Sequence, residues 1–213
     1  MSNIDWIKRQ LFFRGITSKK ILEAFEKVPR ELFVPSEMRY FVDNDAPIPI
    51  GYGQTTSQPY IIALMIQYLN LSGDEKVLEI GTGRGYQTAI LSHLAKEVYS
   101  IEIIPQLADE ARERLKKLGI KSVQIFTGDG TLGLPQYAPY DAIIVSAFSP
   151  SVPSPLLDQL ADGGRLIIPI GSTGLQYLYL YKKKGDNIEK VKLDSCVFVP
   201  LKGEYGLDNE QKT

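Results

Sequence analysis

Cysteine and histidine are almost absent from this chain of 213 residues, which contains one of each, Cys196 and His93. A single cysteine excludes a disulfide or a cysteine-based metal cluster within one chain. A His-rich metal site is excluded as well, and a Ser/His or Cys/His catalytic pair would have to use His93. We therefore expect no metal site.

A strong charge of one sign is also missing, since 24 Lys and Arg residues nearly balance 25 Asp and Glu residues. A protein that neutralises many phosphates should be clearly basic, so tight nucleic-acid binding is disfavoured. No stretch approaches the roughly 20 apolar residues that cross a bilayer, and residues 1–15 contain no apolar core of a secretory signal. We expect a soluble cytoplasmic protein with neither nucleic-acid nor membrane partners, and the sequence specifies no oligomeric state.

The residues that are present describe a globular chain, 44% hydrophobic and 23% charged, long enough for one domain and a modest extension. Apolar residues at helical spacing predict two short helices, over 6–13 and 20–28. Gly15 can end the first helix, and Thr17 or Ser18 can begin the second. Proline and glycine then dominate residues 43–59, which we interpret as a long ordered loop rather than a helix or a central strand.

From residue 76 onward, strands alternate with helices. The strands are expected at 76–80, 98–101, 123–126, 141–145 and 165–168, and the helices at 86–95, 106–118 and 155–160. Such alternation predicts a parallel sheet with helices on both faces. Two further strands, at 175–181 and 191–199, should pair antiparallel.

The expected fold class is therefore α/β: a Rossmann-like, mostly parallel doubly wound sheet that ends in an antiparallel hairpin, with a small N-terminal helical extension. We divide the chain into N-terminal helices and a loop (1–58), a ligand-binding α/β domain (59–205) and a frayed tail (206–213).

The main chemical signal is a glycine-rich turn, EIGTGRGY at residues 79–86, which follows a strand and opens a helix. A dinucleotide fingerprint has glycines at its first, third and sixth positions, but here the last glycine comes one residue early and Tyr86 occupies the sixth position. Glu79 would also repel a pyrophosphate. A cationic ligand without phosphate, such as S-adenosylmethionine, fits better. The alternative is a plain strand-to-helix turn.

Two more acidic residues follow neighbouring strands. Glu102 stands about 20 residues past the glycine turn, where a carboxylate can accept the ribose hydroxyls of a nucleoside. Asp129, between Gly128 and Gly130, can accept from an adenine amino group. Taken singly, Glu102 can be a solvated strand-end acid and Asp129 a turn former. Three acids at the carboxyl ends of three successive strands favour one ligand site, because open α/β sheets bind ligands at that edge.

Several segments together carry a family resemblance. They are ELFVP (31–35), PIPIGYGQTTSQP (47–59), VLEIGTGRGYQTAILS (77–92), GDGTLG (128–133), PYDAIIVSA (139–147), GGRLIIPIG (163–171) and FVPL (198–201). Over about residues 22–201 the chain resembles the protein-L-isoaspartate O-methyltransferases, and GYGQTTSQP is its most specific segment. The resemblance implies a methyltransferase fold and methyl transfer from S-adenosylmethionine to the free α-carboxylate of L-isoaspartyl residues in damaged proteins and peptides. The methyl ester then collapses to a succinimide, which hydrolyses partly to aspartate.

The resemblance also implies roles for single residues. Ser57 would hold the substrate carboxylate, with Thr55 beside it in the reaction site. Gly81, Gly83 and Gly85 would shape the methionine pocket, Glu102 would bind the ribose, and Asp129 with Gly130 would bind the adenine end. We expect Glu79, Thr82, Tyr86 and Ile103 to complete the cofactor site. A carboxylic acid with a pKa near 4 is already ionised at neutral pH, so the reaction needs no strong base.

Other interpretations of these residues remain open. Ser57 followed by Gln58 and Pro59 also fits a helix N-cap, a role that can coexist with binding a carboxylate. Ile62 stands where some relatives place a cofactor-contacting histidine, and Phe148 is expected to narrow the substrate groove. The protein can also be another S-adenosylmethionine-dependent methyltransferase, acting on RNA or a small molecule, or a binding module that has lost turnover. A nicotinamide oxidoreductase ranks last because of the glycine spacing.

Overall fold

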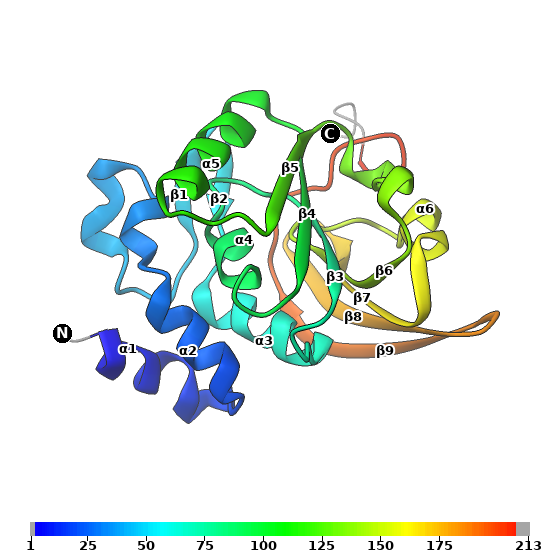
Figure 1. Ribbon diagram of the computed structural model, residues 1–213, viewed down its shortest axis with the longest axis horizontal. Coiled ribbons are helices and arrows are strands. Elements are labelled where there is room, and N and C mark those ends of the chain that lie inside the picture. Colours follow the sequence, from blue (N-terminus) through cyan, green and yellow to red (C-terminus); the bar gives the residue numbers. More distant parts are fainter. Residues whose placement is uncertain (1–2, 208–213) are drawn as a thin grey trace.

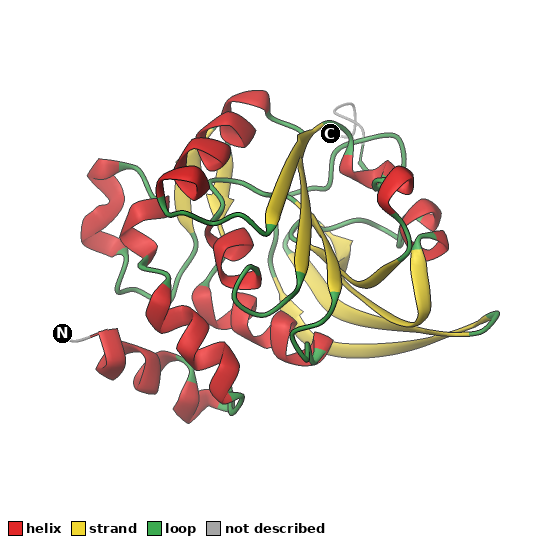
Figure 2. Ribbon diagram, viewed as in Figure 1, coloured by secondary structure: helices red, strands yellow, loops and turns green. Residues whose placement is uncertain are grey.

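A computed structural model describes residues 3–207, and a seven-stranded sheet runs through its centre (Figures 1 and 2). The strands are β3 (Lys76–Ile80), β4 (Glu97–Glu102), β5 (Val123–Thr127), β6 (Tyr140–Val145), β7 (Leu160–Ser172), β8 (Leu175–Lys184) and β9 (Asn187–Cys196). Their order is β5-β4-β3-β6-β7-β8-β9, parallel from β5 to β7 and antiparallel for β8 and β9. The expected fold class is confirmed.

Helices cover both faces of the sheet, because the buried strands present apolar side chains to both sides. The helices of this region are α3 (Pro59–Leu69), α4 (Tyr86–Leu91), α5 (Pro105–Lys117) and α6 (Ser154–Asp158). Val77 and Val98 pack in one core with α3 and α4, and Leu78 packs in a second core with Leu156 of α6. Helix α4 ends four residues before the expected boundary, since residues 92–95 continue only as hydrogen-bonded turns.

The N-terminal helices join the first of these cores. They are α1 (Asn3–Gln10), the 3₁₀ turn η1 (Phe12–Arg14) and α2 (Lys19–Lys27). Gly15 ends η1 at a φ of 98°, and Ser18 is the N-cap residue of α2, as the sequence predicts. Trp6 and Phe25 are buried against α3 and α4, so the extension is not a separate unit.

The segment expected to be one long loop contains regular structure. After the 3₁₀ turns η2 (Arg30–Phe33) and η3 (Ser36–Phe41), strands β1 (Ile48–Gly51) and β2 (Gln54–Thr56) form an antiparallel hairpin. Ile48 and Ile50 are buried while Pro49 is exposed. The prediction was wrong because a two-stranded hairpin has only edge strands, which tolerate proline.

The C-terminal strand also differs from its expected bounds. Strand β9 spans Asn187–Cys196 rather than 191–199, because only Gly185 and Asp186 separate it from β8. The following residues run beside Phe148, whose N–H donates to the Val199 carbonyl at 2.8 Å. The Leu207 N–H donates to the Leu201 carbonyl at 2.7 Å, so the first residues of the expected tail are ordered. Residues 208–213 of that tail lie outside the described residues.

Within residues 3–207, no helix has the length and apolar character needed to cross a membrane.

Candidate active site

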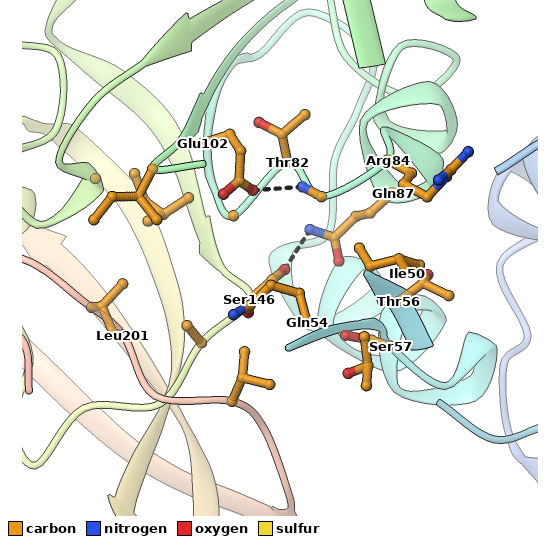
Figure 3. A pocket seen from close by; sticks show the side chains of 18 of the residues that line it. Ile50, Gln54, Thr56, Ser57, Thr82, Arg84, Gln87, Glu102, Ser146 and Leu201 are labelled. Carbon is orange, nitrogen blue, oxygen red and sulfur yellow. Dashed lines mark hydrogen bonds between the residues drawn. The ribbon is translucent and has the colours of Figure 1, made fainter. Parts of the chain in front are cut away.

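A cavity opens at the carboxyl edge of the parallel strands, where the ligand of an open α/β sheet is expected. Figure 3 shows Ile50, Gln54, Thr56 and Ser57 of the hairpin region together on one side of it. The glycine turn, the ends of β4 and β6, and residues 199–202 complete the wall. The proline-flanked loop and the glycine turn therefore share one cavity, with an empty volume of about 860 Å³ including its mouth.

The glycine turn needs left-handed backbone at three positions. Gly81, Gly83 and Gly85 have φ values of 95°, 54° and 90°, which glycine adopts without the clash of a Cβ atom. Gly81 and Gly83 line the cavity, and a Cβ on Gly83 would lie 3.1 Å from Ile50 Cδ1. Gly85 is not on the cavity wall and lies against Ala111 of α5. Gly85 therefore shapes the turn from outside the pocket.

Glu102 is fixed at the cavity wall by backbone donors. One carboxylate oxygen accepts from Gly83 N at 2.8 Å, a bond drawn in Figure 3, and the other accepts from Ile104 N at 3.0 Å. Each carboxylate oxygen has a second lone pair, so this group can still accept two hydroxyl donors. Ile103, 41% exposed, adds apolar surface beside it. This arrangement fits the ribose contact expected of Glu102.

Glu79 does not line the cavity. Its carboxylate is fully buried behind the cavity wall, where it accepts from Ser100 Oγ at 2.6 Å, Thr88 Oγ1 at 2.5 Å and Gln87 Nε2 at 2.9 Å. Burial raises the pKa of Glu79 to about 7, against the opposing effect of these hydrogen bonds. Gln87 does line the cavity and also donates to Ser146 Oγ at 2.9 Å. Glu79 is therefore linked to the cavity wall by the hydrogen bond that it accepts from Gln87.

Thr82 and Tyr86 both line the cavity as expected. The Thr82 hydroxyl lies 2.5 Å from Ser100 Oγ, which links it to the same buried network as Glu79. The Tyr86 ring is buried, with ring centroids 6.1 Å from Phe25 and 5.5 Å from Phe33. Tyr86 thus connects the cavity to the N-terminal elements.

Asp129 makes its hydrogen bonds to protein groups behind the cavity wall. One of its oxygens accepts from the N–H of Thr131 at 2.8 Å and from its hydroxyl at 2.7 Å, and the other accepts from Glu204 N at 2.7 Å. The side chain is absent from the cavity wall, where only its neighbour Gly130 appears. A Cβ on Gly130 would overlap Ile80 Cγ2, which explains the glycine. In this structure Asp129 holds the C-terminal segment through Glu204 N.

Ser57 and Thr55 lie where the cavity meets a second groove. The expected N-cap role of Ser57 was wrong: the cap residue of α3 is Gln58, and the Tyr60 N–H near the start of α3 donates to Asp45 Oδ1 at 2.9 Å. Among residues 3–207 the Ser57 hydroxyl has no hydrogen-bond partner. That hydroxyl remains available to a ligand.

The second groove runs from Ser57 past the β7–β8 turn and residues 195–199. Phe148 does not narrow it, because this side chain is 2% exposed and lines neither the groove nor the cavity. Ile62 does line the cavity and supplies apolar surface there. Sequence reasoning did not assign Gln87 and Ser146 to the site, although they lie within the quoted segments 77–92 and 139–147, and the C-terminal wall falls partly within the FVPL segment.

Known proteins resemble the chain over nearly all its length. A family model described as "Protein-L-isoaspartate(D-aspartate) O-methyltransferase (PCMT)" matches residues 4–206. A protein-L-isoaspartate O-methyltransferase of Dictyoglomus thermophilum is 56% identical over 192 residues, which cover 90% of this chain and 87% of that protein. One of Methanoculleus marisnigri is 46% identical over 206 residues, which cover 97% of this chain and 94% of that protein.

Solved structures agree with the sequence matches. One titled protein-L-isoaspartate O-methyltransferase has a TM-score of 0.86 at 31% identity, covering 95% of this chain and 67% of its own. Another, from Plasmodium falciparum and described as a beta-aspartate methyltransferase in complex with S-adenosyl-L-homocysteine, has a TM-score of 0.81 at 26% identity, covering 95% and 99%. This chain belongs to the protein-L-isoaspartate(D-aspartate) O-methyltransferase family.

Proposed function

We propose that this protein transfers a methyl group from S-adenosylmethionine to the free α-carboxylate of L-isoaspartyl residues in damaged proteins and peptides. The observation that carries the proposal is the position of Ser57, whose unpartnered hydroxyl lies between a cavity and an open groove. Family membership supports the same reaction. The ester product would collapse to a succinimide without the enzyme.

The cavity residues fit S-adenosylmethionine by their chemistry. Glu102 offers acceptors for ribose hydroxyls, and Ile103 and Leu201 offer apolar surface for a base. Among the described residues that line the cavity, the basic side chains are Arg84 and Lys202, and Arg114 donates to the Arg84 carbonyl at 2.8 Å. The Arg84 guanidinium already pairs with Glu110 Oε2 at 2.9 Å. We propose the same set as the cofactor site, with Gly81, Thr82, Gly83, Tyr86 and Gly130 at its wall and Glu79 acting through Gln87.

When bound, the cofactor supplies a methyl group made electrophilic by a sulfonium. The chain's own contribution is to hold the nucleophile in line with it, since orientation alone can supply about 7–11 kcal/mol. Ser57 and Thr55 would donate hydrogen bonds to the substrate carboxylate, which is already ionised at neutral pH. Exclusion of water by residues 47–57 would favour the reaction, because an anion and a cation give neutral products.

We also propose the substrates of this protein and its location in the cell. The substrates would be isoaspartyl-containing proteins and peptides, which enter along the groove beside residues 195–199. Residues 1–58 would then supply Ser57 and Thr55 to the substrate site, and residues 59–205 would supply the glycine turn and Glu102 to the cofactor site. We propose a cytoplasmic location because S-adenosylmethionine is made and consumed inside cells.

The test uses two peptides that differ only in isoaspartate or aspartate, with cofactor labelled in its methyl group. We expect a base-labile methyl ester on the isoaspartyl peptide alone. Equal labelling of both peptides would contradict the proposed specificity. Labelling of RNA or a small molecule in place of the peptide would favour the alternative methyltransferase activities.

A further inference from the structure

Arg30 is a buried cation whose hydrogen bonds all end on backbone carbonyls near the reaction site. The residue is 5% exposed and lies in η2. Its Nη1 donates to the carbonyls of Val42 at 3.2 Å and Asn44 at 2.8 Å. Its Nη2 donates to the carbonyls of Ala46 at 2.7 Å and Ser57 at 3.3 Å. One guanidinium therefore ties both ends of the segment 42–57 together.

Stability alone gives little reason for an arginine at this place. A buried charge carries a desolvation cost, and a well-packed apolar residue is often at least as stabilising. The planar guanidinium has five donors in a fixed fork, a geometry that the compact ammonium of lysine cannot reproduce. Arg30 instead fixes the conformation of segment 42–57, which contains the four carbonyl oxygens that accept its hydrogen bonds.

Asp45, which belongs to this segment, holds the residues that follow Ser57. Its carboxylate, 7% exposed, forms an ion pair with Arg14 and accepts from Gln58 Nε2 at 2.6 Å and Tyr60 N at 2.9 Å. Asp45 therefore holds the first turn of α3, while Arg30 holds the carbonyl of Ser57. The backbone on both sides of the Ser57 hydroxyl is fixed by groups outside the cavity.

We propose that Arg30 is a positioning residue for the isoaspartyl substrate: it holds segment 42–57 so that Ser57 faces the substrate carboxylate. This inference rests on the proposed function. Arg30 does not line the cavity and makes no hydrogen bond to the glycine turn or to Glu102 among the described residues. Its loss should therefore affect the peptide site more than the cofactor site, where the glycine turn and Glu102 keep their contacts.

The test compares Arg30→Lys with wild type by steady-state kinetics and calorimetry. We expect the KM for the isoaspartyl peptide to rise about tenfold, because only a fraction of the molecules would hold segment 42–57 in the binding conformation. The kcat should fall less than kcat/KM, since bound peptide restores that conformation. The Kd for S-adenosylmethionine should rise by a smaller factor than the peptide KM, because segment 42–57 forms one side of the cofactor cavity while the glycine turn and Glu102 keep their contacts.

Arg165→Lys is the matched control. The Nε atoms of Arg30 and Arg165 are both buried without a hydrogen-bond partner among the described residues. Arg165 likewise donates to a backbone carbonyl, that of Asn70 at 3.0 Å, but it lies at the opposite end of the sheet. Its replacement should lower stability in a similar way and leave the KM for peptide unchanged. Equal KM values in both variants would show a general structural effect and overturn the proposal.

Hydrogen exchange of the ligand-free protein separates this inference from the proposed function. Amides of residues 47–57 should exchange at least about tenfold faster in Arg30→Lys than in wild type, and Arg165→Lys should not show this change. If wild type fails to methylate the isoaspartyl peptide but the exchange difference appears, the substrate assignment fails and the positioning of the segment stands. Unchanged exchange in Arg30→Lys overturns the inference whatever the activity.

Discussion

Single carboxylates at the edge of the sheet have different roles because their surroundings differ. Glu102 lies on the cavity wall, where two backbone N–H groups hold its carboxylate. Glu79 is surrounded by protein, and burial raises the pKa of its carboxyl group to about 7. Only the first is placed to accept directly from a ligand, whereas the second orients the Gln87 amide.

The raised pKa of Glu79 predicts a pH-dependent stability. The folded protein binds this proton more tightly than the unfolded chain, whose glutamate titrates near 4.5, so the free energy of unfolding falls between about pH 4.5 and pH 7. A difference of about 2.5 pKa units corresponds to roughly 3 kcal/mol. The free energy of unfolding of Glu79→Gln minus that of wild type should therefore increase by about this amount as the pH rises from 4.5 to 8, as measured by urea unfolding.

Glu75→Gln is the control for this measurement. Burial raises the pKa of Glu75, but hydrogen bonds from Ser72 and Gly73 outweigh it and lower the pKa overall. The stabilising effect of Glu75 is therefore present above pH 4.5 and lost as the pH falls, so its variant should lose stability relative to wild type as the pH rises. A Glu79→Gln difference that stays constant with pH would contradict the titration of Glu79.

Ser57→Ala should lower turnover with little effect on cofactor binding. The lost hydrogen bond to a charged carboxylate is worth about 1.5–3 kcal/mol, or about 10- to 100-fold in kcat/KM. Ser92→Ala serves as control, because the Ser92 hydroxyl donates to the Ala89 carbonyl outside the cavity. Unchanged kcat/KM in Ser57→Ala would remove Ser57 from the reaction site.

At the scale of elements, two segments far apart in the chain complete the cavity. The β1–β2 hairpin covers the glycine turn from one side, and residues 199–202 form another wall. The C-terminal segment is held by hydrogen bonds from Glu204 N to Asp129 and from Tyr205 N to Thr131 Oγ1 at 3.1 Å. The shape of the cavity thus depends on two segments outside the glycine turn, the β1–β2 hairpin and residues 199–202.

Gly203→Ala should weaken cofactor binding through this C-terminal segment. A Cβ at Gly203 would overlap the Asp129 carboxylate, and its φ of 138° disfavours other residues. Displacement of Leu201 and Lys202 from the wall should raise the Kd for S-adenosylmethionine about tenfold, measured by calorimetry. Gly185→Ala, at a positive φ in the open β8–β9 turn, carries backbone strain alone and should leave the Kd unchanged. Equal Kd values for both variants would contradict the role of the segment.

At the scale of the whole molecule, the N-terminal helices and the sheet form one folding unit. Phe25 and Phe33 pack on Tyr86 at the start of α4, and Trp6 joins the same core while its Nε1 donates to the Asp43 carbonyl at 2.7 Å. Because this shared core is continuous, the extension cannot lose its packing without exposing α3 and α4.

This shared core predicts a single cooperative unfolding transition. Trp6 is the one tryptophan of the chain, so its fluorescence reports on α1, whereas far-ultraviolet circular dichroism reports on all helices and strands. The two signals should give the same urea midpoint. Phe25→Ala should shift both midpoints together, with a loss of about 3–5 kcal/mol. An earlier fluorescence transition would show that the extension unfolds independently.

Much of the fold follows from local patterns. The alternation of apolar strands and amphipathic helices predicts the parallel order, because each buried strand requires helices on both faces. The β1–β2 hairpin escaped prediction because its prolines and glycines are equally typical of irregular loops. Asp45 accepts from the Tyr60 N–H in the first turn of α3. No local pattern predicts this contact, because Asp45 lies 15 residues before Tyr60 in the chain.

The sequence alone determined the sheet, the glycine turn at its carboxyl edge, and the acidic residues near the carboxyl ends of its strands, because periodicity and glycine conformation are local properties. Only the tertiary structure decided which acids reach the cavity. All three acids accept from protein donors, but among them Glu102 lines the cavity, whereas Glu79 and Asp129 lie behind its wall. Hydrogen-bond satisfaction depends on residues brought together from distant parts of the chain, as with Arg30 and Ser57, and no local pattern encodes it.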